Sequence, residues 1–287
     1  MAKRVNRSGR ASGGKVHQRQ GLKILVCGYG YVGQQYYNLL SKHYFVHVFD
    51  TQKPSVPNRI KNVTRETLWD FVFICVPTPQ ANDGACDIGA VIHCLLAFRA
   101  KTFVIKSTVS IGVTDYLSKK HNTDCVFSPE YCGESSYDNT YEFHTNAVKT
   151  PFVVLGGDAE AVQRVYELLL PIVGPQKKWF FLTAKEAEMV KYLENTFYAV
   201  KITYCNEMYN VCRALGVDWH KAREAWLADP RINPMHTAVF AGKRGFSGKC
   251  LPKDLSALIV TALAKGYSPK LLMQAYITNE EIKANEN

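Results

Sequence analysis

The apolar run Lys23-Ile-Leu-Val-Cys27 and the glycine motif Gly28-Tyr-Gly-Tyr-Val-Gly33 directly behind it decide the fold of this chain. A short apolar run of this kind predicts a buried parallel strand. The G-x-G-x-x-G pattern predicts a tight turn into a helix, which we expect to continue to about Lys42. A second apolar run, Phe45–Phe49, follows and leads to Asp50. Strand, glycine turn, helix and strand in this order indicate a dinucleotide-binding unit.

Each residue of this motif has an expected role in holding NAD. Gly28 permits the tight turn, Gly30 lets a pyrophosphate approach the backbone, and Gly33 lets the helix pack closely on the sheet. The helix N-terminus then holds the phosphate charge. Asp50 can accept hydrogen bonds from the ribose hydroxyls, and its charge repels a 2′-phosphate, which favours NAD over NADP. The remaining motif residues, Tyr29, Tyr31 and Val32, are expected to line the same site.

The rest of the chain divides into two patterns. Up to residue 182, apolar runs alternate with helical stretches, which predicts an α/β fold with a doubly wound parallel sheet, the Rossmann architecture. The expected strands are Phe71–Val76, Thr102–Lys106, Cys125–Phe127 and Phe152–Leu155, and the expected helices include Ile88–Phe98 and Ala159–Leu169.

From Ala184 to Leu215 the chain has no Pro or Gly and is apolar at helical spacing. This predicts one helix of roughly 30 residues, about 45 Å long. Further helices are expected at Leu255–Lys265 and Pro269–Lys283. We therefore expect an NAD-binding domain over residues 21–182 and an all-helical domain over 183–287 that pairs two subunits in a homodimer.

Composition sets the general class of protein. Of the 287 residues, 47% are hydrophobic and 21% are charged, which is typical of a globular protein. No apolar run approaches the roughly 18 residues of a membrane helix. The basic N-terminus has no apolar stretch behind it, so no secretory signal is expected either, and a cytoplasmic protein is predicted.

Much of the positive charge lies at the N-terminus. Residues 1–20 contain six Lys or Arg and no acid, so they hold six of the ten net positive charges. We expect them to form a disordered tail, because they have little apolar surface to bury. A basic arm can bind nucleic acid, but a solvated tail is the more common case, and we expect no nucleic-acid partner.

Nine cysteines are present: Cys27, Cys75, Cys86, Cys94, Cys125, Cys132, Cys205, Cys212 and Cys250. No Cys-x-x-Cys pair and no zinc-ligand spacing occur among them, so no metal site is expected. Eight are interpreted as reduced thiols packed as small hydrophobic residues. Cys250 differs, because it lies in a polar, glycine-rich loop between Lys249 and Lys253. Nearby cations lower the pKa of a thiol, which predicts a reactive nucleophile.

Other polar residues are placed for chemistry around such a nucleophile. Lys191 and Asn195 lie four residues apart on one face of the long helix and could stabilise an oxyanion. Either Glu130 or Glu134 could be a general base. Thr108 follows a predicted strand, at the sheet edge where doubly wound folds bind ligands.

Taken together, the motifs resemble the UDP-glucose/GDP-mannose dehydrogenase family, and most closely its bacterial UDP-glucose dehydrogenases. The resemblance extends from Leu22 to the C-terminus, with segments in the order of the family. They are Val76-Pro-Thr-Pro79, Asp83-Gly84-x-x-Asp87, Lys106-Ser-Thr-Val109, Ser128-Pro-Glu-Tyr-Cys-Gly-Glu134, Glu188-Met-Val-Lys191, Asn206-Glu207, Asp229-Pro-Arg-Ile232 and Gly245-Phe-Ser-Gly-Lys-Cys-Leu-Pro-Lys-Asp254.

The resemblance implies oxidation of the C6 alcohol of UDP-glucose to UDP-glucuronate with NAD, through a thioester on Cys250. Lys191 and Asn195 would stabilise the oxyanion, and Asp254 with Thr108 would bind water. Pro77 and Pro79 would shape the nicotinamide pocket, and the implied cofactor-binding residues are Val76, Pro77, Thr78, Ser107 and Thr108. The implied substrate-binding set is Glu130, Tyr131, Lys191, Asn195, Phe246, Gly248 and Arg231, of which Arg231 would reach the substrate of the neighbouring subunit.

Three features depart from the family. Relatives continue with a nucleotide-gripping domain beyond the point where this chain stops, so another chain could supply it. The segment between Asp50 and Phe71 is shorter than in relatives. The family loop Gly-Phe-Gly-Gly reads Gly245-Phe246-Ser247-Gly248 here, and a positive φ at Ser247 would cost about 1 kcal/mol.

Two alternatives stay open on the sequence. One is a dehydrogenase of the β-hydroxyacid or 6-phosphogluconate type, which performs a single oxidation and needs no cysteine. The other is a non-catalytic relative that keeps the fold as a binding or assembly protein.

Overall fold

A computed structural model describes residues 21–62, 64–131 and 149–285, and over these residues seven strands form one sheet. The sheet order is β2-β1-β3-β4-β5-β6-β7. The strands are β1 (Ile24–Cys27), β2 (Val46–Phe49), β3 (Leu68–Ile74), β4 (Arg99–Ile105), β5 (Cys125–Phe127), β6 (Phe152–Gly156) and β7 (Lys178–Leu182). All neighbours pair in parallel except β5 and β6. The predicted α/β doubly wound fold is confirmed.

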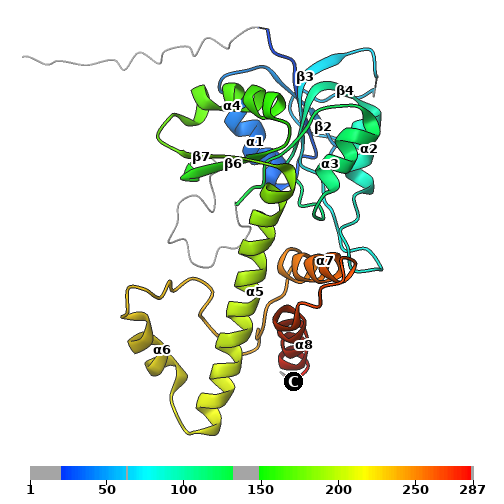
Figure 1. The fold of residues 1–287 in the computed structure, drawn as a ribbon. Coiled ribbons are helices and arrows are strands. Elements are labelled where there is room, and N and C mark those ends of the chain that lie inside the picture. Colours follow the sequence, from blue (N-terminus) through cyan, green and yellow to red (C-terminus); the bar gives the residue numbers. More distant parts are fainter. Residues whose placement is uncertain (1–20, 63, 132–148, 286–287) are drawn as a thin grey trace, which may run out of the picture.

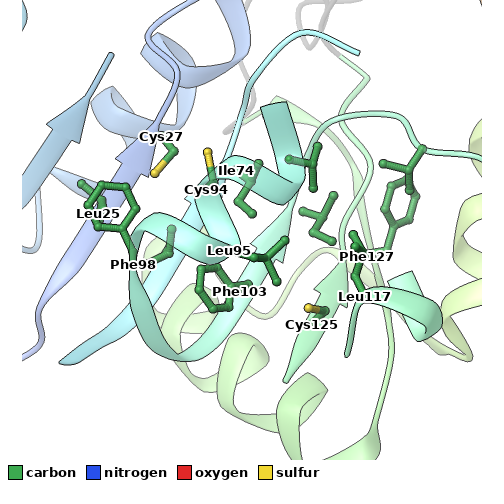
Figure 2. Packing of buried hydrophobic residues seen from close by; sticks show 14 of the residues in the cluster. Leu25, Cys27, Ile74, Cys94, Leu95, Phe98, Phe103, Leu117, Cys125 and Phe127 are labelled. Atoms are coloured by element: carbon green, nitrogen blue, oxygen red, sulfur yellow. The ribbon is translucent and has the colours of Figure 1, made fainter. Parts of the chain in front are cut away.

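Helices cover both faces of this sheet (Figure 1). They are α1 (Tyr31–Leu40), α2 (Gly89–Ala97), α3 (Val113–His121) and α4 (Ala159–Val173). Residues of α2 and α3 pack with one face of the strands, as Figure 2 shows for Leu95, Leu117 and Phe103. Residues of α1 and α4 pack against the opposite face, including Leu40 and Val165. A buried layer therefore supports each face of the sheet, and the glycine motif follows the carboxyl end of β1.

Beyond the sheet, the described chain is helical. The helices are α5 (Ala184–Ala214), α6 (Trp219–Leu227), α7 (Leu251–Leu263) and α8 (Lys270–Ala284). The long helix α5 leaves the sheet, with α7 and α8 along one side of it and α6 near its far end (Figure 1). Leu255 of α7 packs with Ala199 of α5 and with Phe246, and Trp219 of α6 packs with Cys205 of α5. That the two parts are separate domains, divided at residue 182, stays a prediction.

Cysteines in the described part of the chain are all free thiols. Six are buried, Cys212 is half-buried and Cys250 is exposed. This matches the interpretation of the buried ones as small hydrophobic residues, while Cys132 lies outside the described residues. No helix in the described ranges is both long enough and apolar enough to cross a membrane.

Candidate active site

The glycine turn between β1 and α1 is held by Asp50. Its carboxylate accepts hydrogen bonds from the backbone N–H groups of Tyr29 and Lys53, each at 2.7 Å, and of Gln52 at 2.8 Å. Burial favours the neutral acid, but these donors and the Lys53 ammonium outweigh it and hold the pKa of Asp50 below its usual range. Asp50 is therefore a charged group at the carboxyl end of β2, where the sequence predicts the ribose contact.

The three motif glycines differ in what surrounds them. A Cβ at Gly28, whose φ is +87°, would lie 2.6 Å from the carbonyl oxygen of Cys75. A Cβ at Gly33 would lie 1.9 Å from the carbonyl oxygen of Gly28. Both positions therefore require glycine for packing. Around Gly30, the N-cap of α1, no atom lies within 4 Å of such a Cβ, so the backbone there is open to a ligand. The turn fits a pyrophosphate at the N-terminus of α1, next to Tyr31 and Val32.

The carboxyl ends of β3 and β4 bring the predicted nicotinamide pocket together. The Ser107 hydroxyl donates to the carbonyl oxygen of Val76 at 2.6 Å, and the Thr78 hydroxyl donates to that of Thr108 at 2.7 Å. Pro77 lies between the two contacts and is exposed. Side chains and backbone of the two loops thus form one wall at the edge of the sheet.

A buried lysine supports the segment that leads to Glu130. The Lys106 ammonium donates to the Ser128 hydroxyl at 3.0 Å and to the Pro129 carbonyl oxygen at 3.1 Å. It also lies 4.2 Å from the centre of the Tyr36 ring. Lys106 belongs to a segment that resembles the family, but only the structure shows that its ammonium supports the backbone before Glu130.

The loop after β3 contacts α7 of the helical part. The Gln80 side chain donates to the Ser256 hydroxyl at 3.0 Å, and this hydroxyl donates to the Gly84 carbonyl oxygen at 3.1 Å. Nearby, the Lys253 ammonium lies 3.5 Å from the sulfur of Cys86. These contacts place α7 against the cofactor-binding half of the chain.

Cys250 is the N-cap of α7, and Asp254 lies one turn further on. The Asp254 carboxylate is 1% exposed and accepts hydrogen bonds from the Asn195 amide and the Lys253 ammonium. Burial lowers the pKa of Lys253, but the effects of Asp254 and Cys86 are larger in sum. The pKa of Lys253 is therefore raised above its ordinary value, and this lysine is a cation. The predicted Cys250, Asn195 and Asp254 therefore lie in one cluster, and Lys253 joins it.

Lys191 lies on the same side of α5 and holds the backbone of Glu130. Its ammonium donates to the Glu130 carbonyl oxygen at 2.9 Å and lies 5.2 Å from the centre of the Tyr131 ring. The Tyr131 hydroxyl is buried without a hydrogen-bond partner among the described residues. The charges of Lys191 and Glu130 both act on the Cys250 thiol. Glu134, the other predicted base, lies outside the described residues.

The expected activation of Cys250 by neighbouring cations is wrong for this state of the protein. Desolvation by the packed atoms beside the thiol and the Asp254 carboxylate raise the pKa of Cys250, and Lys191 and Lys253 lower it by less. The sequence showed the flanking lysines but not the buried carboxylate one helical turn away. The shift favours the neutral thiol over the thiolate.

The loop before Cys250 differs from expectation at Ser247. This residue is not among those with positive φ, whereas Gly245 and Gly248 adopt φ of +75° and +84°. The expected strain at Ser247 is therefore absent. The Phe246 side chain is 2% exposed and packs in the helical core, so it is not available to a ligand in this arrangement.

Arg231 stands apart from the cluster. Its guanidinium is exposed and pairs with Asp229, with a nitrogen–oxygen distance of 2.6 Å. Three cluster members were not predicted as site residues. They are Lys253, Cys86 and Tyr192, whose hydroxyl lies 3.4 Å from the Cys86 sulfur. Cys86 and Tyr192 are 106 residues apart in the sequence, so no local pattern indicates that they meet.

A glycine turn between β1 and α1 with an acid at the end of β2 is the arrangement of an NAD-binding dehydrogenase fold. Sequence models of the UDP-glucose/GDP-mannose dehydrogenase family match the chain twice. The NAD-binding domain matches residues 51–170 and the central domain matches residues 185–281. The chain belongs to this family, and NAD is its cofactor.

Curated relatives include UDP-glucose 6-dehydrogenases from Haloferax volcanii, 29% identical, and Bacillus subtilis, 30% identical. The alignments cover 74% and 80% of this chain but 52% and 50% of the relatives, so the chain spans about half of their length. A GDP-mannose 6-dehydrogenase of Pseudomonas aeruginosa is 31% identical over 67% of this chain and 47% of the relative.

Solved structures share the fold. A UDP-glucose dehydrogenase from Pyrobaculum islandicum superposes with a TM-score of 0.76 at 23% identity, covering 95% of this chain and 70% of that one. A 3-hydroxyisobutyrate dehydrogenase from Mycobacterium tuberculosis superposes with a TM-score of 0.66 at 20% identity, covering 92% of this chain and 94% of that one. The fold alone therefore does not separate one oxidation from two.

Proposed function

We propose that this protein oxidises the C6 alcohol of a nucleotide sugar, UDP-glucose first among the candidates, to the carboxylate in two steps with a thioester on Cys250. The observation that carries the proposal is the cluster in which Cys250 begins α7 next to Asp254, Asn195 and Lys253. Single-oxidation dehydrogenases need no cysteine at such a position. The choice of UDP-glucose rests on the relatives that carry this name.

The chain's own residues have distinct tasks in this reaction. The glycine turn and Asp50 would hold NAD, which would supply the hydride acceptor for each oxidation. Asp254 accepts a hydrogen bond from the Asn195 amide, which fixes the orientation of that amide one helical turn from Cys250. Asn195 and Lys191 are suited to stabilise negative charge on the substrate oxygen once the sulfur has added to the aldehyde.

Proton transfer needs a base because the pKa of Cys250 is raised. Glu130 is the described carboxylate that acts on the thiol from outside α7, and it can accept a proton from the thiol or from water. The water then attacks the thioester carbon, the carbon–sulfur bond breaks, and the sulfur leaves as the thiolate, which takes up a proton. Glu134 stays an alternative base.

The deciding experiment compares Cys250→Ser with Cys212→Ser, a control that removes another free thiol on α5. Reduced nicotinamide is followed by absorbance with millimolar UDP-glucose, GDP-mannose and related sugar nucleotides. We expect Cys250→Ser to abolish acid formation while NAD still binds, because an alkoxide is hard to form at neutral pH. Cys212→Ser should keep full activity.

Two other outcomes would replace the proposal. Turnover that survives Cys250→Ser would indicate a single-oxidation dehydrogenase of the β-hydroxyacid class, whose fold this chain shares. A protein that binds NAD but turns over none of these substrates would be a non-catalytic binding or assembly relative.

A further inference from the structure

The loop that precedes Cys250 is held by two buried asparagines from different helices. Asn279 of α8 is fully buried and Asn206 of α5 is 2% exposed. The Asn279 side-chain oxygen accepts the Phe246 N–H at 2.7 Å, and its amide donates to the Phe246 carbonyl oxygen at 3.1 Å. The Asn279 side chain is thus hydrogen-bonded to both the N–H and the carbonyl group of Phe246.

Asn206 holds the start of the same loop. Its side-chain oxygen accepts from the Gly245 N–H at 3.2 Å and from the Arg244 guanidinium at 3.1 Å. The same guanidinium donates to the Asn206 carbonyl oxygen at 2.7 Å and to the Asn210 side chain at 2.8 Å. These bonds join the loop to α5, the helix that also carries Lys191.

The contact between Asn279 and Phe246 requires glycine at position 245, the residue before Phe246. A Cβ at Gly245 would lie 2.6 Å from the Asn279 side-chain oxygen, and Gly245 has a φ of +75°. Phe246 fills the core between α5 and α7 beside Leu255. The loop has little freedom upstream of the thiol as long as Asn279 is in place.

We infer that Asn279 is a positioning residue for the nucleophile loop, acting through the Phe246 backbone to fix residues 245–249 beside Cys250. It touches neither Cys250 nor the cofactor turn. A buried amide that satisfies two backbone groups at once is costly to replace, because its loss leaves both without partners. The functional consequence rests on the proposed role of Cys250, but the geometry of the loop does not.

The test compares Asn279→Ala with Thr203→Val. Thr203 is also buried between α5 and α8, where its hydroxyl donates to the carbonyl oxygens of Ala199 and Ala275, but it does not contact the loop. The rate of Cys250 alkylation by iodoacetamide at pH 8 is measured by peptide mass spectrometry. We expect Asn279→Ala to raise it about threefold or more, because a loosened loop relieves the desolvation of the thiol and so increases its reactive thiolate fraction. Thr203→Val should leave the rate unchanged.

Turnover gives a second readout. With the sugar nucleotide we expect Asn279→Ala to lower kcat about tenfold with a smaller change in KM, because the loop that leads into Cys250 moves and the thiol is less well placed. The dissociation constant for NAD should not change. A folded Asn279→Ala protein with an unchanged alkylation rate would overturn the inference.

If Asn279→Ala fails to fold, Asn279→Ser and Gly245→Ala decide in its place. The added Cβ of Gly245→Ala would clash with the Asn279 side-chain oxygen and disturb the same contact. This variant should therefore also raise the alkylation rate. A parent protein without turnover would refute the proposed function alone, since the alkylation rates would still decide whether Asn279 positions the loop.

Discussion

Asp50 combines two tasks in one side chain. It receives three backbone N–H groups of the turn and of the segment behind it, and it presents a negative charge where a ribose would lie. The sequence predicted the charge, because an acid at the end of the second strand follows from the motif. It did not show that the same carboxylate fixes the turn, since the segment after Asp50 has no pattern of its own.

The first prediction separates these tasks with Asp50→Asn. The amide keeps an oxygen that can accept a hydrogen bond but removes the charge that repels a 2′-phosphate. We expect the parent protein to bind NAD at least about tenfold more tightly than NADP, and Asp50→Asn to reduce that preference. Calorimetric titration with both cofactors measures it.

Asp158→Asn is the matched control, because Asp158 caps α4 and an asparagine keeps the cap. The preference for NAD should be unchanged in this variant. Equal affinities of the parent protein for NAD and NADP would contradict the assignment of Asp50.

Cys250 shows where residue-level prediction ends. Its place in a polar loop separated it correctly from the buried thiols, because sequence context reveals local polarity. The direction of its pKa was wrong, because Asp254 is 1% exposed and its field acts from inside the helix start. Burial of a polar partner depends on packing between α5 and α7, which no local pattern encodes.

At the scale of elements, the predicted strand positions follow the apolar runs, and the differences have a physical cause. β3 and β4 begin at Leu68 and Arg99, earlier than predicted, because Asp70 in β3 pairs with Lys101 in β4 at 2.8 Å. A charged pair inside two strands breaks the apolar pattern without breaking the sheet. The edge strand β7 was not predicted at all.

The start of α5 is specified locally. Thr183 and Glu186 form a capping box, in which each side chain bonds the backbone N–H of the other. Two residues after Glu186, Glu188 is fully buried and reaches α3, where its carboxylate accepts hydrogen bonds from the N–H groups of Gly112 and Thr114, the latter at 2.8 Å. The long helix was therefore predictable, but its attachment to α3 was not.

The second prediction concerns this attachment. Glu188→Ala leaves two backbone donors without an acceptor, so we expect a loss of about 2–5 kcal/mol in the free energy of unfolding, measured with urea. Glu188→Gln keeps one acceptor oxygen and should cost less. Burial is the largest influence on Glu188 and raises its pKa above the ordinary value, against the opposing hydrogen bonds.

The sign of the pH dependence follows from that shift. A carboxyl group with a raised pKa in the folded state binds more protons folded than unfolded, so its contribution is greatest in acid and falls as pH rises through the folded pKa. The stability of the parent relative to Glu188→Gln should therefore decrease with rising pH and then level off. A difference that grows with pH would show that the hydrogen bonds outweigh burial.

At the scale of the whole molecule, α5 presents an apolar stripe to solvent. Leu193, Phe197, Tyr204 and Val211 are spaced by four, seven and seven residues, which places them on one helix face. Between 40% and 61% of each is exposed. A stripe of this size on a long helix is typical of a helix that pairs with another copy.

The third prediction is a homodimer across this stripe. Light scattering over a range of concentrations should give twice the mass of the chain, and Phe197→Glu should give a monomer, because it buries a charge at the centre of the stripe. Leu96→Glu, a similarly exposed apolar position on α2, is the control and should remain dimeric. A parent protein that stays monomeric at every concentration would rule the interface out.

The fourth prediction is that Arg231 serves the site of the partner in such a dimer. Its guanidinium is exposed and bonds only to nearby Asp229 among the interactions described for it. If it serves the partner's site, Arg231→Ala and Cys250→Ser proteins should each be inactive. After mixing and exchange of subunits, a mixed dimer joins an intact cysteine in one subunit to an intact arginine from the other. One of its two sites is then complete, so about a quarter of the parent activity per site should return. Recovery near zero from a mixture shown to exchange subunits would place the task of Arg231 within its own chain.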